Sequence, residues 1–214
     1  MEIDRQGPGE ELNLGTEETV PRPAATVIVL RGAAAALEVL PVQRNQEARF
    51  MGGAWVFPGG AVDRDEGHGD AALRAAAVRE VAEEAGIRLP APEQLVPFSR
   101  WITTAQVKIR FDTWFYLAPL PEGSEPRVDG EEVVDARWYE PAAALEAAAD
   151  GQLLLVFPTK ASRAALGLRV LRSSARLRAE PRDPPGRASR RDVGRAGARA
   201  ATRRAWLRRV ALAP

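Results

Sequence analysis

The sequence of 214 residues contains no cysteine and only one histidine, His68. Without cysteine the chain can form no disulfide framework, thiol nucleophile or cysteine-ligated zinc or iron–sulfur centre. A single histidine excludes a multi-histidine metal site and argues against a Ser-His-Asp triad. Hydrolytic chemistry in this chain would therefore depend on carboxylates and on a hard cation such as Mg²⁺ or Mn²⁺.

Long hydrophobic runs are also missing. The apolar stretches at residues 24–30 and 153–157 are far shorter than the ~20 residues that a membrane-spanning helix needs. The first residues are acidic, with Glu2 and Asp4, which is not typical of a secretory signal. We therefore expect a cytoplasmic protein that does not associate with a membrane.

Charge is distributed unevenly along the chain. Residues 172–214 contain 13 arginines against three acidic residues, a local charge of +10. Residues 1–171 contain 17 basic and 26 acidic residues, a local charge of −9. Such an acidic body and basic end are physically different parts and are interpreted separately.

The composition divides the chain into three segments. Residues 1–23 are polar and rich in Gly and Pro, which indicates a flexible N-terminal arm. Residues 24–171 alternate between apolar strand-like and helix-like stretches, and we interpret them as one domain. Residues 172–214, called the basic tail below, have the Arg, Ala, Pro and Gly composition of a disordered segment.

The predicted domain is of the α/β (α+β) class. A helix is expected where Ala, Leu, Arg and Glu dominate over residues 71–85, and Gly86 provides its left-handed stop. Pro141 is expected to start a second helix that ends at Gly151. Strands and a last helix complete the prediction: strands at 25–30, 37–42, 55–57, 107–117 and 133–139, and a helix at 159–171.

The predicted helix at residues 71–85 carries a group of carboxylates. Glu80, Glu83 and Glu84 are spaced at i, i+3 and i+4, so that they share one face of the helix. Like charges in this arrangement repel, and the helix dipole disfavours negative charge near the C-terminal end. A divalent cation would convert this unfavourable cluster into a binding site. Arg79 lies four residues before Glu83 and could orient its carboxylate. The alternative to a metal site is that the three glutamates form a solvated acidic face.

The stretch from Gly60 to Ile87 resembles the Nudix box, G-x5-E-x7-R-E-U-x-E-E-x-G-U. The first half matches as Gly60-x5-Glu66, and the second half matches from Arg79 to Ile87. Twelve residues separate Glu66 from Arg79 where the pattern has seven, which is an insertion of five residues before the helix. Counted back from Arg79, the position of the first glutamate is Ala71.

The resemblance implies a Nudix-like fold, a mixed β-sheet sandwiched between helices, and hydrolysis of a nucleoside diphosphate linked to another group, X. It implies that Glu80, Glu83 and Glu84 bind Mg²⁺ or Mn²⁺ and that Arg79 supports catalysis. The general base varies within the superfamily. Candidates here are Glu83 and Glu84 on the helix and Glu131 and Glu132 before the predicted strand at 133–139.

A second motif precedes the box. Residues 44–60 resemble the coenzyme A diphosphatase signature R-[SA]-x3-R-x3-G-x3-F-P-G-G, with Asn45 as the one departure within that span. Arg44 and Arg49 would bind substrate phosphates through their guanidinium groups, beside Gly59 and Gly60; pairing with the acidic surface is the competing interpretation. Coenzyme A or acyl-CoA is the substrate class that this resemblance implies.

Other interpretations stay open. The chain could be a Nudix-fold nucleotide-binding module without catalytic activity, and the lengthened box favours this alternative. Nucleic-acid binding by the basic tail is disfavoured, because its one aromatic residue is Trp206 and it contains no known module. The tail also resembles the product of a shifted reading frame. A small-molecule nucleotide is the expected partner, and a homodimer is an open possibility.

Overall fold

A computed structural model describes residues 12–13, 18–33, 36–48, 50–156 and 159. The basic tail, most of the predicted helix at 159–171 and the predicted phosphate ligand Arg49 lie outside the described residues. Among the residues that the structure describes, no helix combines the length and the apolar character needed to cross a membrane.

The structure contains eight described strands, two α-helices and two short 3₁₀ helices. The elements are β1 (Arg22–Arg31), β2 (Glu38–Val39), β3 (Val42–Arg44), β4 (Trp55–Val56), β5 (Gly59–Ala61), η1 (Arg64–Glu66), α1 (Gly69–Ala85), η2 (Pro92–Gln94), β6 (Val96–Ile102), β7 (Phe111–Pro119), β8 (Val133–Ala136) and α2 (Pro141–Ala149).

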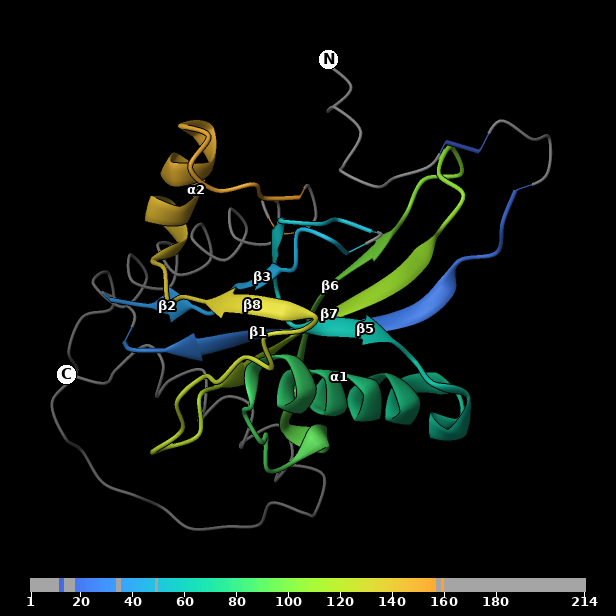
Figure 1. Cartoon of the computed structure of the whole chain (residues 1–214). Helices are drawn as coiled ribbons and strands as arrows, with labels where there is room; N and C mark the ends of the chain where they lie inside the picture. The colour runs from blue at the N-terminus through green and yellow to red at the C-terminus, as the bar shows by residue number, and fades with distance from the viewer. Residues whose placement is uncertain (1–11, 14–17, 34–35, 49, 157–158, 160–214) are drawn as a thin grey trace, which may run out of the picture.

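The strands form two sheets, which lie above α1 in Figure 1. The larger sheet has the order β2-β1-β7-β6, and β5 also pairs with β1. Strands β1 and β7 are parallel, whereas β1 pairs antiparallel with β2 and β5. The smaller sheet has the order β4-β3-β8 and is antiparallel. Seven consecutive residues of β1 are buried, as expected for a central strand covered on both faces.

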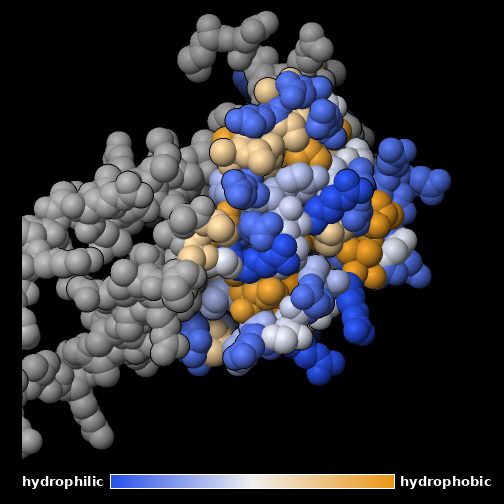
Figure 2. All heavy atoms as spheres, turned by 90° about the vertical axis from the view of Figure 1, so that its left-hand side faces the viewer, coloured by the Kyte–Doolittle hydropathy of each residue, from blue (hydrophilic) through white to orange (hydrophobic). Residues whose placement is uncertain are grey.

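Helix α1 packs on β1 and β5 through small side chains. Ala76, Ala77 and Ala85 are fully buried, and Val81 joins them in the main core cluster with Val27 and others. Alanines on this face let the helix backbone approach the sheet closely, because they add little bulk. The close approach places the C-terminal half of α1 against β5. On the face shown in Figure 2, hydrophobic residues reach the surface in separate patches between hydrophilic ones.

The mixed α+β class and the main helix are confirmed. Helix α1 ends at Ala85, and Gly86 caps it in the left-handed conformation with φ of 64°. The predicted strand pair at 25–30 and 37–42 is present, but a break at Leu40-Pro41 divides its second strand into β2 and β3.

Two strand predictions differ from the structure. The strand expected from residue 107 begins at Phe111, because the backbone N–H of Val107 bonds to the carbonyl of Thr104 and closes a turn. The alternating pattern of residues 107–110 therefore does not mark a regular strand. Strand β6 was not predicted from the sequence. Among the described strands it lies at the edge of the sheet and pairs with β7 alone, and none of its residues is buried, so its hydrophobic signal is weak.

The described part of the predicted N-terminal arm contacts the domain. The backbone N–H of Asn13 bonds to the carbonyl of Gln106, and Leu12 bridges Val107. Strand β1 begins at Arg22, two residues before the predicted start of the domain. The three-segment division of the chain as a whole stays a prediction.

Replacement of Gly86 by alanine should destabilise the domain by about 1–2 kcal/mol, because an L-residue at positive φ is strained. A Cβ at this position would also lie 2.7 Å from the carbonyl oxygen of Arg127. Urea unfolding would measure the loss. Gly123→Ala is the matched control, since Gly123 has φ of 73° but open space around it. Equal losses in both variants would show that the Arg127 contact is unimportant.

Candidate active site

The C-terminal half of α1 lies directly against the two glycines of β5. The backbone N–H of Gly59 donates a hydrogen bond of 2.9 Å to Glu84 Oε2. A Cβ on Gly60 would overlap the carboxylate of Glu80, and a Cβ on Gly59 would overlap the backbone of β1. Gly59 is required for β5 to fit against the backbone of β1, whereas a side chain at Gly60 would displace the Glu80 carboxylate from its present position.

One carboxylate on this face, that of Glu84, is buried, and that of Glu80 is partly buried. Glu84 is 3% exposed, and burial raises its pKa to about 8; the Gly59 hydrogen bond opposes this shift and the charge of Glu80 adds to it. Burial likewise raises the pKa of Glu80, although hydrogen bonding to Arg79 opposes the shift. Both groups lack enough nearby positive charge to offset the loss of water.

Arg79 lies at the centre of an ion-pair network on the other side of this face. Its Nη1 donates to Glu80 Oε1 at 2.8 Å and to Glu83 Oε2 at 3.0 Å. Its Nε donates to Glu66 Oε1 at 3.0 Å, and its Nη2 donates to the carbonyl of Ala61 at 3.0 Å. The hydrogen bond to Glu66 is the largest of the causes that raise the pKa of Arg79. The network holds the Arg79 side chain between α1 and the segment of residues 61–66 that precedes it.

Glu66 reaches this network despite the insertion. The chain forms η1 and then starts α1 at Gly69, and the side chain of Glu66 returns to Arg79 with 12% exposure. Glu66 also accepts the backbone N–H of Asp63 at 2.7 Å. Burial opposes ionisation, but the hydrogen bonds from Arg79 and Asp63 hold the pKa of Glu66 below its usual value. Glu66, not Ala71, therefore occupies the place beside the box arginine.

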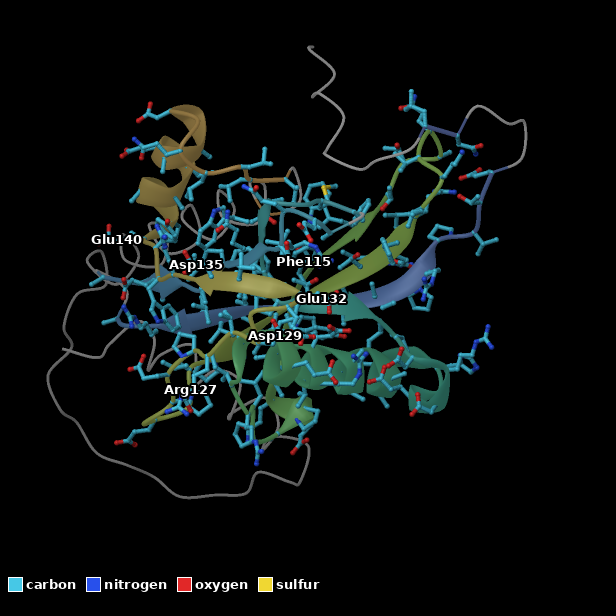
Figure 3. The ribbon with its side chains drawn as sticks, in the orientation of Figure 1. Phe115, Arg127, Asp129, Glu132, Asp135 and Glu140 are labelled. Atoms are coloured by element: carbon cyan, nitrogen blue, oxygen red, sulfur yellow. The ribbon has the colours of Figure 1, made fainter. Side chains whose placement is uncertain are left out.

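Arg44 and Glu132 face the buried carboxylates from the smaller sheet. Arg44 Nη1 lies 3.7 Å from Glu84 Oε1, and its Nη2 lies 3.5 Å from Glu132 Oε1. Both distances exceed the ~2.7–3.2 Å of a direct hydrogen bond. The Nε of Arg44 is buried without a hydrogen-bond partner. Glu132 is 64% exposed and lies between the start of β8 and α1 (Figure 3).

An open cavity of about 440 Å³ adjoins Arg44 and Glu132. One wall comes from the loop after β3, with Asn45 and Phe50, and the other comes from Glu131 and Glu132. A space of this size is large enough for part of a nucleotide-sized ligand. Arg44 borders the cavity and also lies 3.7 Å from Glu84, so it lies between the cavity and the carboxylates of α1.

The residues fit a divalent cation by their chemistry, although their present contacts are with arginine. In the part of the chain that the structure describes, no three acidic or histidine side chains converge on one point as a metal-binding group. Glu80 and Glu83 are bonded to Arg79 instead. The carboxylate oxygens of Glu80 and Glu84 are hard ligands, and buried Glu84 has Arg44 only at 3.7 Å to balance its charge. A dication would supply further positive charge.

Sequence reasoning did not identify two further parts of the site. Asp63 lies 3.4 Å from Arg79 Nη2, and the carbonyl of Ala61 accepts a hydrogen bond from the same atom. The spacing Asp63-x-x-Glu66 is a capping pattern and could have indicated the turn that positions Glu66. No sequence signal reports a backbone carbonyl, so the role of Ala61 required the structure.

Glu66→Gln should lower the free energy of unfolding by about 1–2 kcal/mol at pH 7, because it weakens a charge-assisted pair with Arg79. The pKa of Glu66 is lower in the folded protein than in the unfolded chain, so ionised Glu66 stabilises the fold at pH values above the unfolded pKa. This stabilisation is lost as pH falls through the folded pKa. The difference between variant and wild type should therefore shrink below about pH 4. Asp65→Asn, an exposed neighbour, is the control for the charge change. An unchanged stability at pH 7 would contradict the network.

Comparison with known proteins agrees with this geometry. The family model described as NUDIX domain matches residues 20–157. Putative nudix hydrolase 7 of Caenorhabditis elegans is 28% identical over 173 residues, which cover 64% of this chain and 57% of that protein. The chain thus spans little more than half the length of this curated relative.

Solved structures show the same fold. The crystal structure of a NUDIX hydrolase from Alicyclobacillus acidocaldarius is 30% identical, with a TM-score of 0.62, and the match covers 70% of this chain and 92% of that one. The NUDIX domain of Shewanella oneidensis NrtR, solved with ADP ribose, is 20% identical, with a TM-score of 0.51 and coverage of 74% and 90%. With a NUDIX model matching well over half of its residues, the chain belongs to the NUDIX domain family.

Proposed function

We propose that this protein is a metal-dependent hydrolase that cleaves the diphosphate of a nucleoside diphosphate linked to a group X. One observation supports the proposal most strongly: Glu84 is buried and Glu80 is partly buried on α1, and Glu132 faces them across Arg44. An inactive binding module has no need to keep buried glutamates in a site that water and substrate can reach through an open cavity.

Nudix hydrolases generally use divalent metal ions. Glu80, Glu83 and Glu84 would hold Mg²⁺ or Mn²⁺ in this chain, and Arg79 would orient Glu80 and Glu83 through the bonds described above. The cation, when bound, lowers the pKa of a water molecule and offsets charge on the phosphoryl oxygens.

Glu132 is the carboxylate that we assign as the general base. Glu84 is buried, and Glu80 and Glu83 are paired with Arg79, whereas the exposed Glu132 carboxylate faces the site from a separate element. In the proposed step the oxygen of a water molecule bonds to one phosphorus, and the bond from that phosphorus to the bridging oxygen breaks. Glu132 accepts the proton of the water, and the bridging oxygen leaves with the second phosphate.

Coenzyme A or acyl-CoA is the substrate class that we propose. Arg44 lies within the motif similar to the coenzyme A diphosphatase signature, and its unpartnered Nε and long ion pairs leave it able to bind a phosphate. Arg49 is proposed as a second phosphate ligand from the same motif. The backbone of Gly59 and Gly60 would lie beside the diphosphate.

Glu84→Gln tests the hydrolase proposal. The folded pKa of Glu84 is raised to about 8, above its unfolded value, so this carboxyl group lowers the stability of the fold once the pH rises above the unfolded pKa. A neutral glutamine can still accept the Gly59 N–H, so we expect no loss of stability. Turnover of coenzyme A or another nucleoside diphosphate compound should fall by about 10²–10³ or more. Thermal unfolding and single-substrate kinetics with Mg²⁺ and Mn²⁺ would measure both.

Two controls accompany this experiment. Glu146→Gln removes an exposed carboxylate from α2 and should leave turnover unchanged. Glu83→Gln removes a proposed ligand that is 59% exposed and should also reduce turnover. If the wild type binds nucleotide tightly but neither Glu83→Gln nor Glu84→Gln changes any reaction, the inactive binding module becomes the better description.

Arg44→Ala tests the substrate class. If Arg44 binds a coenzyme A phosphate, the substitution should raise KM for coenzyme A about tenfold or more, the effect of losing one charge-assisted hydrogen-bond pair. KM for the analogue without the 3′-phosphate should rise less. Equal increases for both compounds would leave the diphosphate as the group that Arg44 contacts and would remove the support for coenzyme A.

A further inference from the structure

Glu132 belongs to a short loop whose backbone is held by hydrogen bonds to the side chain of Asp129, a residue of the same loop. Asp129 Oδ1 accepts the backbone N–H of Glu131 at 3.0 Å and that of Val133 at 3.1 Å. These hydrogen bonds lower the pKa of Asp129, although its slight burial opposes the shift. Asp129 and Glu132 lie next to one another above α1, whereas Asp135 and Glu140 lie toward the far end of β8 (Figure 3). Asp129 therefore fixes the backbone on both sides of Glu132.

Asn45, on the opposite wall of the cavity, forms hydrogen bonds to the same loop. Its backbone N–H donates to the carbonyl of Glu132 at 3.0 Å, and its side-chain Nδ2 donates to the carbonyl of Glu131 at 2.8 Å. Its Oδ1 accepts the backbone N–H of Glu47 at 3.0 Å. Both ends of the amide are thus used, one within its own loop and one across the cavity. Asn45 is the residue at which the chain departs from the coenzyme A diphosphatase signature.

We propose that Asn45 and Asp129 are positioning residues that together hold the Glu131–Glu132 backbone so that the Glu132 carboxylate faces Arg44 and the glutamates of α1. The role of Glu132 as base rests on the proposed function. Neither Asn45 nor Asp129 contacts the reacting atoms; they act through the loop.

The arrangement matters because Glu132 itself is weakly held. Its side chain is 64% exposed. Its Oε1 lies 3.5 Å from Arg44 Nη2, which makes an ion pair but is too long for a close hydrogen bond. A carboxylate on an unsupported loop would sample many orientations, and each ordered side chain loses entropy. Fixing the backbone at Glu131, Glu132 and Val133 limits that freedom. Catalysis is sensitive to this, since a misplacement of ~1 Å can reduce turnover about 10²-fold.

Three variants test the positioning role. Asp129→Ala removes the acceptor and should lower kcat about tenfold or more, whereas Asp129→Asn keeps an acceptor oxygen and should retain kcat within about threefold. Asn45→Ser keeps a short acceptor for Glu47 but cannot reach the Glu131 carbonyl, so kcat should also fall. Amide hydrogen exchange at Glu131 and Val133 should accelerate in Asp129→Ala and not in Asp129→Asn.

A double-mutant cycle with Glu132→Gln separates positioning from general support of the fold. If Asp129 and Asn45 act through Glu132, their substitutions should cost little further kcat once Glu132 is glutamine. Losses that persist at full size in the Glu132→Gln background would overturn the inference while leaving the hydrolase proposal intact. So would an Asp129→Asn variant as slow as Asp129→Ala. A wild-type protein that hydrolyses no nucleoside diphosphate compound would overturn the proposed function instead, and with it the catalytic part of this inference; the exchange data would still report the two loop contacts.

Discussion

The site depends on the contact between two glycines of β5 and two glutamates of α1. Gly59 donates its N–H to Glu84, and Gly60 leaves the space that the Glu80 carboxylate occupies. A side chain at Gly59 would separate β5 from β1, and one at Gly60 would displace the Glu80 carboxylate. The approach removes Glu84 from water, at a cost that a single backbone hydrogen bond cannot offset. Positive charge near Glu80 and Glu84 is therefore stabilising.

Two arginines place positive charge near these glutamates, from different elements. Arg79 comes from α1 and bonds to Glu80, Glu83 and Glu66, so that it neutralises the outer part of the face. Arg44 comes from β3 and lies 3.7 Å from Glu84, without a direct hydrogen bond to it. The first arginine is saturated with partners and serves to orient the helix carboxylates. The second has an unpartnered buried N–H and is the arginine that can respond to a ligand.

Much of the fold could be predicted because its signals are local. The helix composition and the stop at Gly86 predicted α1 well, and the i, i+3 and i+4 spacing predicted that the glutamates share one face. The turn at residues 104–107 was missed because the alternating pattern of residues 107–110 is the same as that of a strand, and the edge strand β6 was missed because its pairing with β7 joins residues distant in sequence. The same limit applied to Glu66. Box spacing alone offered either Glu66 or Ala71, and only the path of the chain through η1 decides between them.

The position of Arg44 relative to the carboxylates constrains how an anionic substrate can enter. A diphosphate that approaches Arg44 also approaches Glu84 and Glu132, which lie within 4 Å of the same guanidinium. Repulsion between these carboxylates and the phosphates would offset much of the attraction to Arg44. Binding becomes favourable only when further positive charge compensates Glu80 and Glu84. Under the proposed function, the geometry would couple substrate binding to cation binding, because the carboxylates that repel the phosphates would attract the cation. The proposed cation and the Arg44 guanidinium would then act on the substrate together.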